Sequence, residues 1–390
     1  MSSNVVRALL KRLIPIAIGR RLNRLMLALC ALPRDVAILW AASPAKAEVG
    51  VYYGYHYIPG PHENVHGGLT KFQCMQDVFP NSPTRFNILY MVSSEIPPGG
   101  ELQKAWLARI KRKRVVWNQN GVAYPEWADP GWKQINSRMA TLLREADYVF
   151  YQSHFCKLSA DEFLGERNGP SEILYNAVDT CTLTPADSDP SPRDLVLLLG
   201  GTQDQYYRLA CALEVVSHIV EHRPDVQLLV TGRLCWPHEN GIHDQARCEG
   251  QAHELVKRVG LENRVNFLGP YTQVEAPSIF RRAHLLLHTK VNDPCPRLVV
   301  EAMACGLPVV YSRSGGVPEL VGDDAGIGVQ AEVSWERHIP PDSKAMAQAV
   351  LMIAEKRKQF AEAARQRAVE KFDLKPWIQR HREVFESLLR

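Results

Sequence analysis

The sequence contains none of the short motifs that would tie it to a zinc site or a dinucleotide cofactor. Its nine cysteines are scattered, odd in number and never arranged as Cys-x-x-Cys. This pattern argues against a structural zinc site and a disulfide framework, and it indicates a reducing compartment. No Gly-x-Gly-x-x-Gly follows any candidate strand, which argues against an NAD-dependent enzyme. No apolar run is long enough to cross a bilayer.

Acidic side chains are absent from residues 1–34, which carry seven Lys and Arg residues. The formal net charge of the chain is +4, so residues 35–390 have a net charge of −3, and a general nucleic-acid surface is not expected. The segment mixes apolar and basic residues at helical spacing. It therefore fits an amphipathic helix on an anionic membrane and, equally, a surface helix packed on the first domain. AKA at 45–47 mimics a signal-peptide cleavage site, but the break at Pro33 and the length of the segment argue against that interpretation.

The length of 390 residues suits two domains, each with its own core. Near-continuous apolar runs alternate with helical stretches on both sides of a Pro-, Asp- and Ser-rich linker at 181–194, which predicts parallel sheets covered on both faces. The expected fold class is α/β, with two doubly wound Rossmann-like parallel-sheet domains facing a cleft. Strands are expected at 36–40, 49–55, 86–92, 114–119, 148–152 and 172–176, and then at 195–200, 225–232, 264–269, 284–289 and 308–312.

The expected organisation has four parts. Residues 1–45 form the basic N-terminal segment, and 46–185 form an acceptor-binding N-terminal domain. Residues 186–372 form a nucleotide-sugar-binding C-terminal domain, and 373–390 form a helix that crosses back to the N-terminal domain. Parallel open sheets bind ligands beyond the carboxyl ends of their strands, so the site is expected between the two domains.

Two acids, Asp293 and Glu301, stand eight residues apart around the start of a predicted helix. Asp293 lies in a Pro-containing loop after a strand, and Glu301 lies one to two turns into the helix. The free N–H groups of the first turn, at 297–299, form an anion site suited to phosphate. A carboxylate only accepts hydrogen bonds, so each acid suits a neighbouring hydroxyl group. A nucleotide-diphosphate sugar has this layout, although either acid alone would be interpreted as a capping or solvated residue.

The ordered set around these acids resembles the family-4 retaining glycosyltransferases, which have the GT-B fold. That family has an acid-x7-acid motif followed by EAMACGLPVV and GGVPE, which stand here at 301–310 and 315–319. The resemblance covers most of residues 48–385. It implies that Asp293, where the family more often has Glu, contacts the transferred sugar and that Glu301 contacts the ribose. The diphosphate-binding positions that it implies are Pro296, Arg297, Leu298 and Val299.

The resemblance also implies contacts from two further loops. His66, Gly67 and Gly68 stand where family members place a Gly-Gly near the donor diphosphate and the acceptor, although Gly-Gly alone fits a plain turn. RVNFLGPY at 264–271, with Gly269, matches the strand and turn that hold the nucleotide base. The family's contacts there are largely through the backbone, so the base cannot be named from the sequence.

The sequence departs from the family pattern at two places. The family has an Arg and a Lys after the first strand of the second domain, and here Arg208 alone stands at or next to the Lys position, with Arg233 as a second cation that could reach the cleft. A histidine that touches the donor sugar in many relatives is replaced by Asn118 and Asn120, which can hydrogen-bond a hydroxyl but cannot act as a base. His66 could compensate, or no protein base is needed.

The sequence therefore predicts a metal-independent retaining hexosyltransferase without a cofactor. Its donor is a nucleotide-diphosphate sugar, and its acceptor is a sugar or a lipid-linked sugar of bacterial polysaccharide or glycolipid biosynthesis. Asp293, Glu301 and Arg208 are the predicted catalytic residues in a front-face mechanism. The protein is expected in the cytoplasm, with residues 1–34 as a peripheral contact to the inner membrane face. A GT-B nucleotide-sugar epimerase and a non-catalytic GT-B scaffold remain as alternatives.

Overall fold

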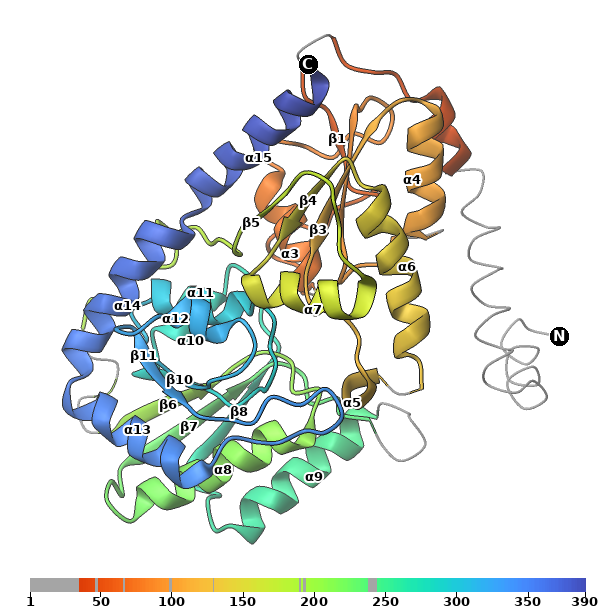
Figure 1. Cartoon of the computed structure of the whole chain (residues 1–390). Coiled ribbons are helices and arrows are strands. Elements are labelled where there is room, and N and C mark those ends of the chain that lie inside the picture. Colours follow the sequence, from red (N-terminus) through yellow and green to blue (C-terminus); the bar gives the residue numbers. More distant parts are fainter. Residues whose placement is uncertain are drawn as a thin grey trace, which may run out of the picture.

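The computed structural model of the chain describes residues 35–45, 48–65, 67–97, 100–128, 130–188, 191, 194–237 and 244–390. These residues form two α/β halves, each built on one sheet (Figure 1). The strand order is β1-β2-β3-β4-β5 in the N-terminal sheet and β11-β10-β9-β6-β7-β8 in the C-terminal sheet. All neighbouring strands within the two sheets are parallel. The predicted class of two doubly wound parallel-sheet domains is confirmed.

The N-terminal sheet is covered by helices on both faces because successive strand residues enter two different cores. Leu89 and Met91 of β2 pack with α4, α6 and α7, whereas Ile88, Tyr90 and Val92 pack with α3 and α15. The strands are β1 (Val51–Tyr52), β2 (Ile88–Val92), β3 (Arg114–Gln119), β4 (Tyr148–Tyr151) and β5 (Ser171–Ile173). The helices are α3 (Gly67–Met75), α4 (Glu101–Ile110), α5 (Pro125–Ala128), α6 (Trp132–Glu145), α7 (His154–Leu164) and α15 (Leu374–Leu389).

The C-terminal sheet has the same construction. Leu195, Leu197 and Leu199 of β6 pack with α8, α9 and α13, and Val196 and Leu198 face the side of α10, α11, α12 and α14. The strands are β6 (Leu195–Leu199), β7 (Val226–Thr231), β8 (Val265–Gly269), β9 (Leu285–His288), β10 (Val309–Ser312) and β11 (Gly326–Val329). The helices are α8 (Tyr206–Val220), α9 (Gln245–Arg258), α10 (Ala276–Phe280), α11 (Arg297–Ala304), α12 (Val317–Val321), α13 (Ser343–Glu355) and α14 (Arg357–Phe372).

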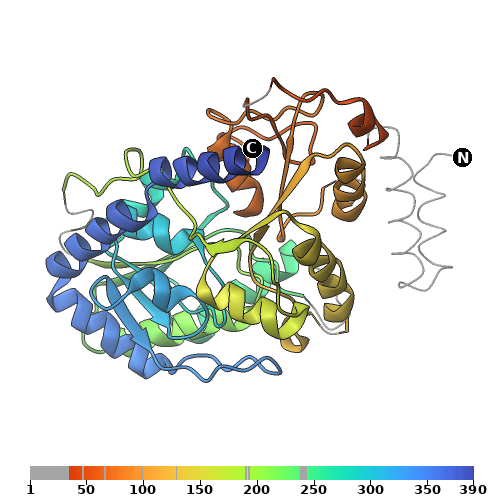
Figure 2. The same ribbon diagram turned by 45° about the horizontal axis from the view of Figure 1, so that its top comes forward.

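The last helix, α15, leaves the C-terminal half and lies along the N-terminal half (Figure 2). Asp373 caps it, since its side chain accepts a hydrogen bond from the backbone N–H of Lys375 at 3.1 Å. Trp377, Ile378 and Phe385 of α15 then pack into the core beside β1 and β2. None of the helices in the described ranges is long and apolar enough to cross a membrane.

Two details differ from the sequence-based expectation. The predicted strand at 36–40 is wrong: Ala37–Trp40 forms a 3-10 helix, η1, which buries Ile38 against α4 and has no strand beside it to pair with. The sequence also missed β11, because its Gly-Ile-Gly-Val run is short and glycine weakens a strand. Gly326 is needed there, because a Cβ would lie 2.1 Å from the carbonyl oxygen of Val309 on β10.

Candidate functional site

A cleft of about 680 Å³ lies between the two domains. Both sheets contribute residues from the loops that follow the carboxyl ends of their strands, which is the expected place for a ligand in open parallel sheets. The N-terminal side includes Gly68, Lys71, Glu95, Asn120, Gln152 and Asn176. The C-terminal side includes Arg208, His288, Lys290, Asp293, Arg297 and Glu301.

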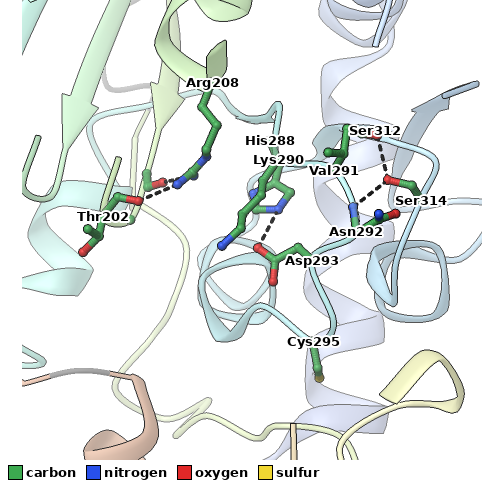
Figure 3. A network of polar contacts seen from close by, with 12 residues as sticks. Thr202, Arg208, His288, Lys290, Val291, Asn292, Asp293, Cys295, Ser312 and Ser314 are labelled. Carbon is green, nitrogen blue, oxygen red and sulfur yellow. Dashed lines mark hydrogen bonds and ion pairs between the residues drawn. The ribbon is translucent and has the colours of Figure 1, made fainter. Parts of the chain in front are cut away.

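Asp293 is held in a positively charged corner of this cleft (Figure 3). Its Oδ2 lies 3.3 Å from Nε2 of His288, the last residue of β9. Burial opposes ionisation of Asp293, but the charge of Lys290 and the contact with His288 outweigh burial, so its pKa falls to about 2. Burial lowers the pKa of His288 below its usual value despite the neighbouring carboxylate. Asp293 is therefore ionised and His288 neutral at physiological pH.

The loop that carries Asp293 is fixed by the segment that follows β10. The N–H of Asn292, a residue with a φ of 51°, donates to Oγ of Ser314 at 3.0 Å (Figure 3). The N–H of Gly316 donates to the carbonyl oxygen of Asp293 at 2.9 Å. A Cβ on Gly315 would lie 2.4 Å from that same oxygen. The Gly-Gly motif is thus required because the two backbones touch.

The same loop also joins the two domains. Oγ of Ser153, the N-cap of α7, donates to the carbonyl oxygen of Pro294 at 2.7 Å, and Nδ2 of Asn176 donates to that of Cys295 at 2.6 Å. Glu319 of the GGVPE motif accepts the N–H groups of His154 and of its neighbour at 2.8 Å each. These acceptors tie the acid loop and α12 to the N-terminal half.

Glu301 lies in the cleft but shares its charge with Arg297. Its Oε1 accepts from Nε of Arg297 at 2.8 Å, and the guanidinium also donates to the carbonyl oxygen of Ala177 at 2.5 Å. The carboxylate is 12% exposed, and no described residue forms a hydrogen bond with Oε2. Oε2 is therefore the atom available to a ligand hydroxyl.

The N-terminus of α11 lies between the two acids, as predicted, but it offers fewer N–H groups than predicted. The N–H of Val299 donates to the carbonyl oxygen of Pro296 at 3.1 Å, and the Val299 side chain is fully buried away from the cleft. Pro296, Arg297 and Leu298 line the cleft. The expectation of a free N–H at Val299 is therefore wrong, and Arg297 and Leu298 contribute the free groups of the first turn.

Arg208 lies at the cleft, but its donors are largely committed to its own loop. The guanidinium donates to the carbonyl oxygens of Thr202 at 2.5 Å and Gly200 at 3.2 Å, and it lies 3.3 Å from Asp204 Oδ1. Its side chain is 3% exposed, whereas that of Lys290, which lies 3.6 Å from Asp204 Oδ2, is 24% exposed. Lys290 is therefore the more accessible cation of the two, and the sequence did not single it out.

The other predicted contacts are divided between the cleft and its surroundings. Gly67, Gly68, Asn120 and Arg233 line the cleft, and a Cβ on Gly68 would lie 2.4 Å from the Glu95 side chain. His66 lies outside the described residues.

Asn118 and Gly269 do not line the cleft that the described residues form. Asn118 is fully buried, and its Oδ1 accepts from Nε2 of Gln152 at 2.6 Å, so Gln152 presents its amide to the cleft instead. Gly269 ends β8 with a φ of 73° and accepts the N–H of Gly232, while the residues that follow it, Pro270 and Tyr271, line the cleft.

His288, Lys290 and Lys71 are the site residues that the sequence did not reveal. His288 and Lys290 flank a strand end three to five residues before Asp293, which is the one signal that could have identified them. Groups of His, Cys, Asp or Glu that could hold a metal ion are absent from the described part of the chain.

Comparison with known proteins points to one family. Residues 186–367 match the family model described as glycosyl transferases group 1. One relative, the phosphatidylinositol N-acetylglucosaminyltransferase of Arabidopsis thaliana, is 27% identical over 222 residues, covering 56% of this chain and 45% of that protein. D-inositol 3-phosphate glycosyltransferase of Mycobacterium sp. strain JLS is 28% identical over 189 residues, covering 46% and 40%. The chain thus matches less than half of the length of either relative.

Solved structures show the same fold. The Anabaena protein HepE in complex with UDP has a TM-score of 0.62 and 21% identity, covering 77% of this chain and 79% of that chain. A glycosyltransferase from Rickettsia africae has a TM-score of 0.59 and 16% identity, covering 78% and 77%. At these identities the likeness shows the GT-B fold.

Proposed function

Since residues 186–367 place this chain among the group 1 glycosyl transferases and its two domains form a GT-B fold, we propose that it is a retaining glycosyltransferase that moves a hexosyl unit from a nucleotide-diphosphate sugar to a hydroxyl acceptor. One observation carries this proposal. Ionised Asp293 and the Oε2 atom of Glu301 lie in one interdomain cleft with the N-terminus of α11 between them in the chain. Two hydroxyl-binding groups around a phosphate site suit a donor with sugar, diphosphate and ribose in that order.

In this mechanism the protein positions the reactants and stabilises the leaving group. The bond between C1 of the donor sugar and the diphosphate oxygen breaks while the acceptor oxygen bonds C1 on the same face, and the acceptor proton passes to the leaving oxygen. Negative charge grows on the diphosphate, where the N–H groups of Arg297 and Leu298 and the charges of Lys290 and Arg208 oppose it. Asp293 holds a hydroxyl of the transferred sugar.

The N-terminal side of the cleft suits a hydroxyl-rich acceptor. Asn120, Gln152 and Asn176 present amides there, and Oδ1 of Asn120 and Oδ1 of Asn176 are buried without a hydrogen-bond partner. Amides cannot take a proton near neutral pH, which favours proton transfer to the leaving diphosphate. The names of the two relatives specify phosphatidylinositol and inositol 3-phosphate. These names support a sugar or polyol acceptor in polysaccharide or glycolipid biosynthesis.

The test is metal-free donor hydrolysis across a panel of UDP-, GDP-, ADP- and dTDP-sugars, with release of nucleoside diphosphate as the readout. One donor is expected to be hydrolysed slowly. Glu301→Ala is expected to lower that rate about a hundredfold or more, because the ribose loses its acceptor and Arg297 loses its partner. Glu301→Gln, which keeps a hydrogen-bonding side chain beside Arg297, checks that the loss is not a folding defect.

Glu254→Ala, an exposed position on α9, is the matched control and should leave the rate unchanged. Free sugar released at a full catalytic rate without acceptor would favour the epimerase. No binding and no release from any donor would overturn the enzyme assignment and favour a GT-B scaffold.

We further propose that the protein contacts an anionic membrane through α4. The predicted contact, residues 1–34, lies outside the described residues. On α4, Leu102, Trp106 and Ile110 are exposed at a spacing of four residues, with 37%, 63% and 51% of their area accessible, so they form one apolar stripe. Trp40 of η1, 77% exposed, lies on the helix that packs against α4. The exposed basic residues beside the stripe are Arg109, Lys111, Arg112 and Arg114.

The double substitution Trp106→Glu and Ile110→Glu is expected to weaken binding to phosphatidylglycerol vesicles about tenfold or more, because it places charge on the stripe. Co-sedimentation measures this, and phosphatidylcholine vesicles should bind neither protein. Met352→Glu, an exposed apolar position on α13, should bind like the wild type. Unchanged binding by the double variant, or loss of a dimer in its place, would exclude α4 as the membrane contact.

A further inference from the structure

Lys71 on α3 is a buried cation without a partner. Its side chain lines the cleft and is 5% exposed, yet no described residue forms a hydrogen bond or ion pair with its ammonium group. The other two buried lysines of the described chain are paired. Lys104 bonds Asp35, and Lys113 donates to three backbone carbonyl oxygens at 2.6 to 3.3 Å. A buried charge without a partner is costly, which indicates a group with a role outside the fold.

The nearby acids cannot serve as partners for Lys71. The Glu95 carboxylate accepts the N–H groups of Gly68 and Leu69 at the start of α3, and Gly68 has no room for a side chain because Glu95 lies against it. Glu301 is engaged by Arg297. Glu95 therefore satisfies the helix terminus and Glu301 satisfies the arginine.

The electrostatic surroundings leave Lys71 short of negative charge. Burial lowers its pKa to about 8. Of the two charged groups that face it across the cleft floor, Arg297 is a second cation and Glu95 is a weak counter-charge. The titratable groups around Lys71 are Glu95, Cys156, Cys295, Arg297 and His381. An anion bound here would restore the balance that the fold does not provide.

We propose that Lys71 binds a phosphate group carried by the acceptor. The proposal rests on the proposed function, because it assigns the N-terminal side of the cleft to the acceptor. Lys71 stands on that side with the amides of Asn120, Gln152 and Asn176. The acceptor is therefore a phosphorylated sugar or polyol whose hydroxyl groups meet the amides while its phosphate meets the ammonium group. A lysine binds such a dianion as a point charge, without the fixed fork of an arginine.

The experiment measures sulfate binding by calorimetry at pH 8 in two buffers that differ in ionisation enthalpy. Sulfate replaces phosphate because it does not titrate in this range, so any proton taken up belongs to the protein. The wild type, both free and saturated with UDP, is expected to bind sulfate with uptake of roughly half a proton, because Lys71 starts half-protonated. Lys71→Met should weaken sulfate binding about tenfold or more, and Lys71→Arg should bind it without proton uptake.

The two possible sources of the phosphate are separated by the UDP arm. Sulfate that binds the UDP-saturated wild type but not Lys71→Met, with UDP affinity unchanged in the variant, supports an acceptor phosphate. Sulfate that is displaced by UDP, with weaker UDP binding by Lys71→Met, would assign Lys71 to the donor diphosphate and overturn the proposal. Equal sulfate binding by wild type and Lys71→Met would also overturn it.

Two controls keep the result separate from the donor assignment. Lys111→Met, an exposed lysine that follows α4, should bind sulfate like the wild type. If UDP binds none of the proteins, the donor assignment fails, but the sulfate titration of the ligand-free wild type and Lys71→Met still decides whether Lys71 is an anion site.

Discussion

Replacing Asp293 with asparagine is expected to lower donor hydrolysis by about two to three orders of magnitude, because a preorganised charge at the reacting sugar is lost while the shape of the side chain is kept. Wild-type Asp293 is ionised across the physiological range, since its pKa is about 2. Asparagine would leave Lys290 without the carboxylate that it faces. The rate of nucleoside diphosphate release from the donor that the panel selects is the measurement.

The effect should fall on the chemical step and not on nucleotide affinity. Asp293 is assigned to the sugar, so UDP should bind Asp293→Asn within about threefold of the wild type. Asp324→Asn, an exposed acid in a loop of the same domain, is the matched control and should hydrolyse the donor normally. A normal hydrolysis rate in Asp293→Asn would remove Asp293 from the site.

Gly315→Ala is expected to lower the free energy of unfolding by about 2 to 4 kcal/mol and to reduce donor hydrolysis strongly. Gly315 has a φ of 69°, and its added methyl group would meet the backbone of Asp293 at 2.4 Å. Because that neighbour is backbone, the acid loop itself must shift. Denaturant unfolding gives the stability, and the hydrolysis assay gives the activity of the folded variant.

A second glycine separates the two contributions. Gly260, which follows α9, also has a φ of 69°, and a Cβ there would meet nothing within 4 Å. Gly260→Ala should therefore show only the backbone strain of about 1 kcal/mol, with normal hydrolysis. Equal losses in both variants would show that the Gly315 contact does not hold the acid loop.

The fold could be predicted largely from the sequence because its strands are buried on both faces. The apolar run of β6 and the alternation of runs with helices specify parallel sheets without knowledge of any contact. The two errors have local causes. The run at 36–40 has no neighbouring strand, and β11 depends on the edge of β10 and on the small size of Gly326.

The candidate site was predictable where its parts are close in the sequence and hidden where they are not. Asp293 and Glu301 share one strand–loop–helix unit, so their spacing indicates their place. The commitment of Arg208 to the carbonyl groups of its own loop was not readable. The isolation of Lys71 depends on contacts that Glu95 and Glu301 make elsewhere. Such contacts join distant segments, which composition and spacing do not reveal.

The most direct measurement is a crystal structure of the protein with the nucleoside diphosphate that the donor panel selects. The diphosphate is expected within hydrogen-bonding distance of the Leu298 N–H at the start of α11, with a ribose hydroxyl on Oε2 of Glu301 and the open end of the diphosphate directed toward Asp293. A nucleotide bound outside the interdomain cleft, or one whose ribose does not contact Glu301, would contradict the assignment of this cleft as a glycosyl donor site.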